Sequence, residues 1–523
     1  MKNDKIANAL NEIDDRYLTE ATKPRVRRPY WITVAAAVLA LVIALSTIPS
    51  PQSDPSGPNL EVPPTGSSSS SSSGNPQNPT PSEPTGFPED PMKPSDSPGG
   101  IDLSVLQTLP DLLRAPVIPE MAPFANYNDF DSYDEYRVAL KAWQESQNAQ
   151  YDQPDGYADS LTDFFRRSIT EFLSGEENAA YSPVNVYMAM AMLAETTAGE
   201  SRQQILDLFG ADSLEELRTQ ASNLWNAHYC DDGQTTLLLG NSLWLTERYS
   251  FHQDTVDRLA NDYYASVFGG LLGTDESNAQ LQQWLNSMTG GLLEEQTKNT
   301  KLSEYAVFAL ASTIYFKAGW MEEFAKEQTT DDIFHSPNGD ITASFMHSKQ
   351  EGVYYRGSNF GAIRLELTGN NGMWIILPDE GVTVAEVLAG EEYLNMTLEH
   401  IGFGNLSGGI LDISLPKFDV TSQSDLIKGM KNLGLSHIFD PYLSDFSPMT
   451  SDNDRLYVSQ IDHAARVVID EEGVIAAAYT VIEASDEACP PSNIIEFIVD
   501  RPFAFIVSSQ DNLPLFAGVV TEP

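Results

Sequence analysis

The sequence predicts an α+β domain that fills residues 157–523 of the 523-residue chain. Early segments of this range, such as 160–173 and 185–199, repeat apolar residues at helical spacing. Later segments, such as 306–319, 372–378 and 494–509, are apolar runs rich in β-branched and aromatic residues, which is typical of buried strands. No Pro/Gly/Ser-rich break divides the range. We therefore expect one large domain with extended sheets rather than two smaller ones.

Composition excludes several classes of function. The chain carries a formal net charge of -45 and has a pI near 4.2. A nucleic-acid partner is excluded on this ground, and an anionic surface is a poor partner for the bulk of the chain. Cys230 and Cys489 lack the spacing of metal ligands, and we interpret both as free thiols. A single disulfide between them is the alternative interpretation. We expect no metal and no cofactor.

An apolar run near the N-terminus predicts a membrane anchor. Residues 31–48 contain 18 consecutive uncharged, mostly apolar residues, which as a helix just span a hydrocarbon core. Basic residues precede the run, namely Lys23, Arg25, Arg27 and Arg28. By the positive-inside rule, residues 1–28 form a cytoplasmic tail, 29–49 a transmembrane helix, and the remainder lies outside the cell. A cleaved signal peptide is the competing interpretation, but the leader and the run are both long for one.

Two segments separate this run from the large domain. Residues 50–100 are dominated by Pro, Ser, Gly and Asn, with serine at every position from 67 to 73, and predict a disordered linker. Residues 101–156 mix aromatic and acidic side chains. Tyr133, Tyr136 and Trp143 recur at helical spacing, so we expect a short amphipathic helix in an extension that packs on the domain.

Nothing in the chain predicts an enzyme. The sequence lacks the nucleophile elbow, the zinc-protease helix motif, the phosphate-binding loop and the dinucleotide fingerprint. His463 stands alone within the strand-like run 458–470, where a histidine is more often a core residue than a catalyst. We assign no catalytic residue.

One segment is unusual on physical grounds. Residues 470–481 read DEEGVIAAAYTV and follow a predicted strand, and a polar, Pro-containing stretch separates them from the next one. Small uncharged residues after a glycine can lie exposed in a long hairpin loop, and they can also slide between strands of a sheet. The composition leaves both interpretations open.

Six blocks in the same order resemble the serpin family of serine protease inhibitors. They are 178–206, 308–324, 411–418, 434–440, 470–480 and 501–520. The resemblance implies a serpin fold with a large central β-sheet, two smaller sheets, about eight to nine helices and an exposed reactive loop. It also implies a single-use mechanism, in which a protease cleaves the loop and the cut loop inserts into the sheet with the protease attached. With the anchor, we expect a bacterial, membrane-anchored, monomeric extracellular inhibitor.

The resemblance assigns the start of the reactive loop. Its hinge comprises Glu471, Glu472, Gly473, Val474, Ile475, Ala476, Ala477, Ala478, Tyr479 and Thr480. Alternate residues of an inserting strand face the buried side, and the inward set Val474, Ala476, Ala478 and Thr480 carries no charge. The family usually has Thr or Ser where Val474 stands. This departure keeps open a non-inhibitory serpin-fold module for binding or adhesion at the cell surface.

Family spacing also assigns the reactive-site bond. Seventeen residues counted inclusively from Glu471 place it at Glu487–Ala488. A glutamate there suggests a glutamyl-specific serine protease. The neighbouring residues Ala484, Ser485 and Ala488 are small, however, so an elastase-like or subtilisin-like protease with a shallow pocket is the favoured partner.

Two further clusters are implied by the resemblance. The first, called the shutter, comprises Ser182, Asn185, Ser312 and His463. Ser312 stands where the family has an asparagine, and Asn185 where it has a serine, so we expect Asn185 to supply the lost amide to His463. The alternative is that Asn185 faces solvent or caps a helix. The second cluster, called the breach, comprises Lys417, Glu471 and Trp320, at the top of the sheet.

Overall fold

The computed structural model describes residues 37–46, 106, 108–398, 405–452, 455–474 and 493–523. This part of the chain contains two nine-stranded sheets and eleven α-helices. The α+β class expected from the sequence is therefore confirmed. The helix count exceeds the expected eight to nine because four of the helices, α10 to α13, are short pieces of four to seven residues.

The central sheet has the order β13-β14-β1-β7-β5-β6-β2. Its strands are β13 (Phe418–Asp425), β14 (Tyr457–Ile469), β1 (Ala37–Ser46), β7 (Ala306–Gly319), β5 (Thr236–Thr246), β6 (Ala265–Gly270) and β2 (Leu112–Arg114), with β4 (Cys230–Asp231) on β5 and β15 (Gly473–Val474) on β7. Every residue of β5 is buried, as are all but one of β7. Both faces of these strands are covered, which explains why their sequences are continuous apolar runs instead of alternating ones.

The second sheet has the order β16-β12-β9-β10-β11-β17-β18-β3. Its strands are β16 (Ile494–Ile498), β12 (Leu406–Pro416), β9 (Gly339–Arg356), β10 (Phe360–Glu366), β11 (Gly372–Pro378), β17 (Phe503–Ser508), β18 (Pro514–Val520) and β3 (Ala179–Tyr181), with β8 (Thr330–Ser336) on β9. Two smaller sheets were expected here. They are joined because β9 is 18 residues long and pairs with β8, β12 and β10 along its length.

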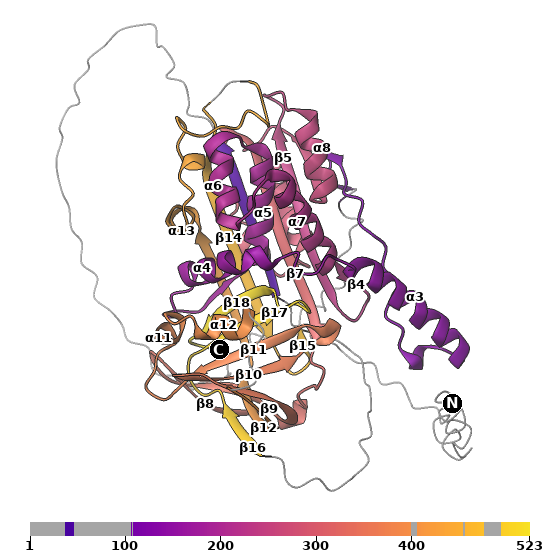
Figure 1. Ribbon diagram of the computed structural model, residues 1–523, viewed down its shortest axis with the longest axis vertical. Helices are drawn as coiled ribbons and strands as arrows, with labels where there is room; N and C mark the ends of the chain where they lie inside the picture. Colours follow the sequence, from indigo (N-terminus) through magenta and orange to yellow (C-terminus); the bar gives the residue numbers. More distant parts are fainter. Residues whose placement is uncertain (1–36, 47–105, 107, 399–404, 453–454, 475–492) are drawn as a thin grey trace, which may run out of the picture. The chain divides into compact units, whose positions relative to one another are not determined.

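The helices lie largely between residues 162 and 288. They are α3 (Tyr133–Tyr151), α4 (Thr162–Phe172), α5 (Pro183–Thr196), α6 (Gly199–Phe209), α7 (Leu214–His228), α8 (Gln253–Asp262), α9 (Asp275–Met288), α10 (Glu294–Thr297), α11 (Val384–Leu388), α12 (Glu392–Leu398) and α13 (Ile427–Asn432). In Figure 1, α5, α6 and α7 lie in front of the central sheet. α5 is buried all round and contacts both β7 and β1.

The apolar N-terminal run is a strand where the structure describes it. A transmembrane helix was expected over 29–49, but Ala37–Ser46 forms β1, paired antiparallel with β14 on one side and β7 on the other. A run of small and β-branched apolar residues suits a strand buried on both faces as well as a lipid-facing helix, so its pattern does not distinguish the two. Among the helices of the described residues, none combines the length and the apolar character of a membrane span.

The extension before the large domain contacts it at two places. The helix expected around 133–143 is confirmed as α3, and Trp143 Nε1 donates to Asp232 Oδ2 at 2.9 Å. Upstream, β2 pairs with β6 at the edge of the central sheet, and Arg114 forms a 2.7 Å ion pair with Asp257 of α8.

Candidate functional site

The candidate site is the position between β7 and β14 in the central sheet, which we call the slot. β1 fills it over ten residues, and its backbone pairs continuously with both neighbours apart from a register shift near its end. The side chains of Val42 to Leu45 are buried. The slot is therefore occupied, and the strand that occupies it comes from far upstream in the chain (Figure 1).

The hinge enters the sheet at the end of this slot. β15 pairs Gly473 with Gly319 and Val474 with Ala318, at the end of β7. Gly473 has a φ of 101°, and a Cβ added there would lie 2.4 Å from the backbone nitrogen of Trp320. A side chain at this position would be strained and would clash, so only glycine fits. The rest of the expected hinge, Ile475–Thr480, and the bond Glu487–Ala488 lie outside the described residues.

The breach residues meet around the carboxylate of Glu471. Lys417 Nζ lies 3.0 Å from Glu471 Oε2, and the Thr329 hydroxyl donates to Oε1 at 2.8 Å. Glu471 is buried and Lys417 half-buried. Burial alone would raise the pKa of Glu471, but the hydrogen bond from Thr329 and the pairing with Lys417 lower it below its ordinary value. The carboxylate therefore stays ionised and anchors the chain just before the hinge.

Trp320 holds the same turn from the other side. Its indole Nε1 donates to the carbonyl of Asp470 at 3.0 Å, and its backbone N–H donates to the carbonyl of Glu472 at 3.3 Å. Its ring packs edge-on against Phe324 at 5.9 Å between centroids. The structure thus brings together all three predicted breach residues, and they fix the turn that leads into Gly473.

One half of the shutter is assembled beneath the sheet. Asn185 Nδ2 donates to the Ser312 carbonyl at 3.2 Å. The Ser312 hydroxyl lies 2.6 Å from Asn185 Oδ1 and 2.8 Å from Asn241 Oδ1, and its single proton can serve only one of them at a time. The alternative that Asn185 faces solvent is wrong, because the residue is fully buried. Ser182 caps α5 by accepting from the Asn185 backbone N–H at 3.3 Å.

The other half of the shutter is not connected to it. His463 is buried, and neither ring nitrogen has a hydrogen-bond partner within the described ranges. Its ring stacks on Tyr181 at 5.5 Å, and burial lowers its pKa to about 3. The expected hydrogen bond between Asn185 and His463 is absent. The reason lies in the sheet, because Leu41 of β1 pairs with Ser312 on one side and with His463 on the other and so separates the two.

Three parts of the candidate site were not predicted from the sequence: two side chains and one strand. Asn241 interrupts the apolar run of β5, and a polar residue within a fully buried strand could have indicated it. Thr329 lies in a loop and gave no such signal. β1 was assigned to the membrane, and its pairing partners are more than 250 residues away in the sequence.

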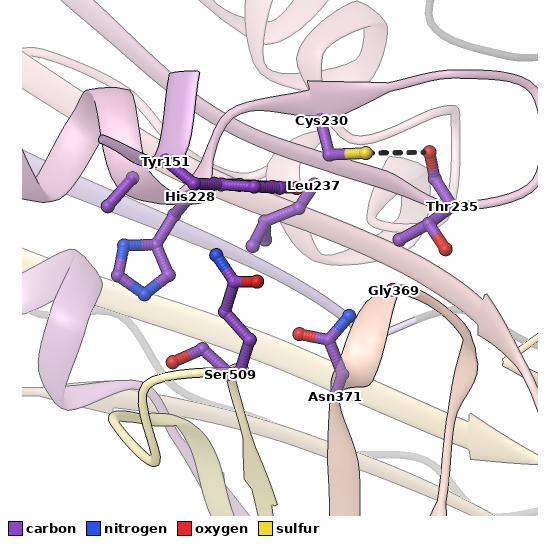
Figure 2. Close-up of a pocket in the computed structure, with 10 residues that line it drawn as sticks. Tyr151, His228, Cys230, Thr235, Leu237, Gly369, Asn371 and Ser509 are labelled. Carbon is purple, nitrogen blue, oxygen red and sulfur yellow. Dashed lines mark hydrogen bonds between the residues drawn. The ribbon is translucent and has the colours of Figure 1, made fainter. Parts of the chain in front are cut away.

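Among the cavities of the described residues, one adjoins the breach and another lies at the end of α3. The larger, of about 490 Å³, adjoins the breach and is lined by Trp320, Leu365, Arg364, Trp374, Val353 and Met321, among others. The smaller, of about 10 Å³, lies between the end of α3 and the domain and is lined by Tyr151, His228, Cys230 and Asn371, among others (Figure 2). It has room for about one water molecule at most. Burial raises the pKa of the Cys230 thiol beside it to about 12, so this thiol is unreactive at neutral pH.

Comparison with known proteins agrees with this architecture. The family model described as "Serpin (serine protease inhibitor)" matches residues 159–523. Alpha-1-antitrypsin 1-4 of Mus musculus is 28% identical over 394 residues, which cover 73% of this chain and 93% of the relative. Serpin-Z2B of Triticum aestivum is 28% identical over 369 residues, which cover 66% of this chain and 90% of the relative.

Solved structures share the fold. The thermophilic serpin tengpin in its native state superposes with a TM-score of 0.62 at 23% identity, over 71% of this chain and 95% of tengpin. Human thyroxine-binding globulin complexed with its ligand superposes with a TM-score of 0.59 at 22% identity, over 72% of this chain and 99% of the globulin. The family match covers well over half of the chain and includes the slot, the breach and the shutter. The chain belongs to the serpin family.

Proposed function

We propose that this serpin is an inhibitor of an extracellular serine protease and acts as a suicide substrate. The observation that carries the proposal is the breach, which holds a glycine hinge at the end of a slot that accepts a strand. In this reaction the protease serine attacks the carbonyl of Glu487, the Glu487–Ala488 bond breaks, and Ala488 leaves with a free amine. The acyl ester stays on Glu487, and insertion of the hinge carries the protease away from its deacylating geometry. The serpin contributes no catalytic group.

The direct test is a covalent complex. The protein is mixed with pancreatic elastase, subtilisin and a glutamyl-specific protease, and the products are separated after boiling in SDS. An inhibitor gives a band at the summed mass less that of the released fragment 488–523 with at least one of them, since an ester survives this treatment. Mass spectrometry of the released C-terminal fragment locates the cut, and a new N-terminus outside 485–490 would show that the assigned register is wrong. Clean cleavage by every protease tried, both in buffer and with the protein reconstituted into phosphatidylcholine vesicles, would reject the proposal.

A hinge variant tests the insertion step separately from cleavage. Val474→Arg places a charge on the inward face of the inserting strand, and burying an unpaired charge costs several kcal/mol. We expect this variant to be cleaved without trapping the protease. Ile475→Arg is the matched control, because the neighbouring residue points to the opposite face. If both variants trap the protease equally, the hinge does not enter the sheet in the proposed register.

We also propose that residues 31–48 anchor the protein in a bacterial cell membrane, with the serpin domain outside. Eighteen uncharged residues behind four basic ones support this proposal. In cells that express the full chain, the protein should stay in the membrane fraction after alkaline carbonate extraction. Protease added to intact cells should remove the serpin domain. Release of the full-length protein into the medium would contradict anchoring.

A non-inhibitory binding module is the second candidate, and one observation favours it. The cavity of about 490 Å³ beside Trp320 falls within the size range of small-molecule sites and has aromatic and aliphatic walls. The dye anilinonaphthalene sulfonate is a suitable probe of such walls. If the cavity binds ligands, Val353→Trp should abolish saturable dye binding, whereas Ile333→Trp, at an equally exposed strand position, should not. Equal binding by both variants would reject this candidate.

A further inference from the structure

The reactive loop and β1 compete for the same place in the sheet. β15 pairs Val474 with Ala318 of β7. Two more residues in this register would bring Ala476 opposite Phe316, and Phe316 is the partner of Ala37. In the same way, the position for Ala478 opposite Ile314 is held by Leu39, and the position for Thr480 opposite Ser312 is held by Leu41. β1 therefore starts almost where the first two hinge residues stop, and every later position of the loop is taken.

The two segments are also chemically alike. β1 reads AVLALVIALS, residues 473–481 of the reactive loop read GVIAAAYTV, and neither segment contains a charge. Ile43 is fully buried and pairs with Leu310 of β7 and Ile461 of β14, which are both fully buried as well. The Ser459 hydroxyl of β14 donates to the Ala44 carbonyl at 3.1 Å. The slot thus accepts the N-terminal segment as a native strand, with apolar contacts on both sides.

We propose that residues 37–46 are an internal competitor of the reactive loop, which occupies the slot and keeps the inhibitor inactive until the segment is withdrawn. This inference rests on the proposed inhibitory function. The same inference names the lipid bilayer as what withdraws residues 37–46 from the slot. The same ten residues lie within the apolar run 31–48, and they cannot be in the sheet and in a bilayer at once. Insertion of the run into lipid empties the slot and leaves the loop free to enter it.

The test compares the full wild-type chain with two single variants, one substituted inside β1 and the other outside it. Ile43→Asp places a carboxylate between Leu310 and Ile461, where it has no partner, and should expel the strand. Thr33→Asp adds the same charge to the same apolar run but lies before β1. Two quantities are measured in buffer without lipid: amide hydrogen exchange over residues 37–46, and the yield of SDS-stable complex with whichever protease the wild type or Ile43→Asp traps. Wild-type protein reconstituted into phosphatidylcholine vesicles is the fourth sample.

We expect residues 37–46 to be protected from exchange in the wild type and in Thr33→Asp, with little complex formed. Ile43→Asp should lose that protection and gain complex, and the wild type in vesicles should gain complex as well. The inference is overturned if 37–46 of the wild type exchange as fast as the linker 50–100. It is also overturned if protected wild type and Ile43→Asp both form complex and form it in equal amounts. If no sample traps any protease while only Ile43→Asp loses protection, β1 occupies the slot as described and the inhibitory function is what fails.

Discussion

The breach and the shutter lie on the same central sheet, yet one is complete and the other is divided. At the breach, Glu471 is bonded to both Lys417 and Thr329. At the shutter, Asn185 and Ser312 are bonded to each other, while His463 has a pKa lowered by burial and no partner within the described residues.

The difference shows how each cluster depends on the slot. The breach residues belong to segments beyond the end of β1, so they meet although the slot is occupied. The shutter needs β7 and β14 to be neighbours, and β1 holds them one strand apart. The hydrogen bonds of the shutter therefore depend on whether a strand occupies the slot. The breach instead fixes the point at which the hinge enters it.

Removing the Lys417–Glu471 ion pair of the breach should lower the free energy of unfolding more than any other change proposed below. Lys417→Met leaves the buried Glu471 carboxylate without its cation, and we expect a loss of about 3 kcal/mol in the free energy of unfolding, at the lower end for buried pairs because Lys417 is partly exposed. The double variant Lys417→Met/Glu471→Gln should recover most of it. Arg356→Gln breaks the exposed pair with Asp379 and should cost less than about 1 kcal/mol. Similar losses from both single variants in urea unfolding would mean that burial does not distinguish the breach.

Breaking the intact half of the shutter should cost less. Asn185→Ala removes both hydrogen bonds to Ser312, and we expect a loss of about 2 kcal/mol. In a Ser312→Asn background the same substitution should cost clearly less, since the new amide replaces the lost donor and acceptor. Urea unfolding of the four proteins forms a double-mutant cycle. An additive cycle would contradict a direct interaction between the two side chains.

His463, which has no hydrogen-bond partner within the described residues, predicts that the free energy of unfolding depends on pH. The unfolded chain protonates His463 near its ordinary pKa of 6.5, whereas the native state does not until about pH 3, so native stability is lost as the pH falls through this range. Between pH 7.5 and 5.5 this amounts to about 1.4 kcal/mol.

His463→Phe should remove this dependence. Asp470, whose pKa burial raises to about 6, acts in the opposite direction but is present in both proteins, so the difference between them isolates His463. The measurement is the unfolding midpoint in urea across the pH range. Parallel pH profiles for the variant and the wild type would show that the ring is partnered in solution.

The smallest loss in the free energy of unfolding is expected for a substitution that tests the hydrogen bond of Trp320. Trp320→Phe keeps an aromatic ring against Phe324 but loses the hydrogen bond to the Asp470 carbonyl, and we expect a loss of about 1 kcal/mol. Hydrogen exchange should localise the change to residues 470–474. An unchanged exchange rate there would mean that the indole N–H does not hold the turn.

Sequence patterns were enough to predict the α+β class, the family, the breach residues and the place of Asn185 beneath the sheet. These follow from local patterns: continuous apolar runs for strands buried on both faces, and short blocks that each place a few residues at fixed positions. The hinge at Gly473 was predicted from one of these blocks as well, and the backbone conformation in the structure explains why the residue is a glycine.

The conformation of residues 37–46, and with it the arrangement of the shutter, could not be predicted from the sequence and depends on long-range strand pairing. An apolar run of this length satisfies its backbone hydrogen bonds as a helix in lipid or as a strand between two others, and its residues suit both. What selects the strand here is the open position between β7 and β14, more than 250 residues away in the chain. Pairing over such a separation leaves no periodicity in the sequence, and the division of Ser312 from His463 follows from it.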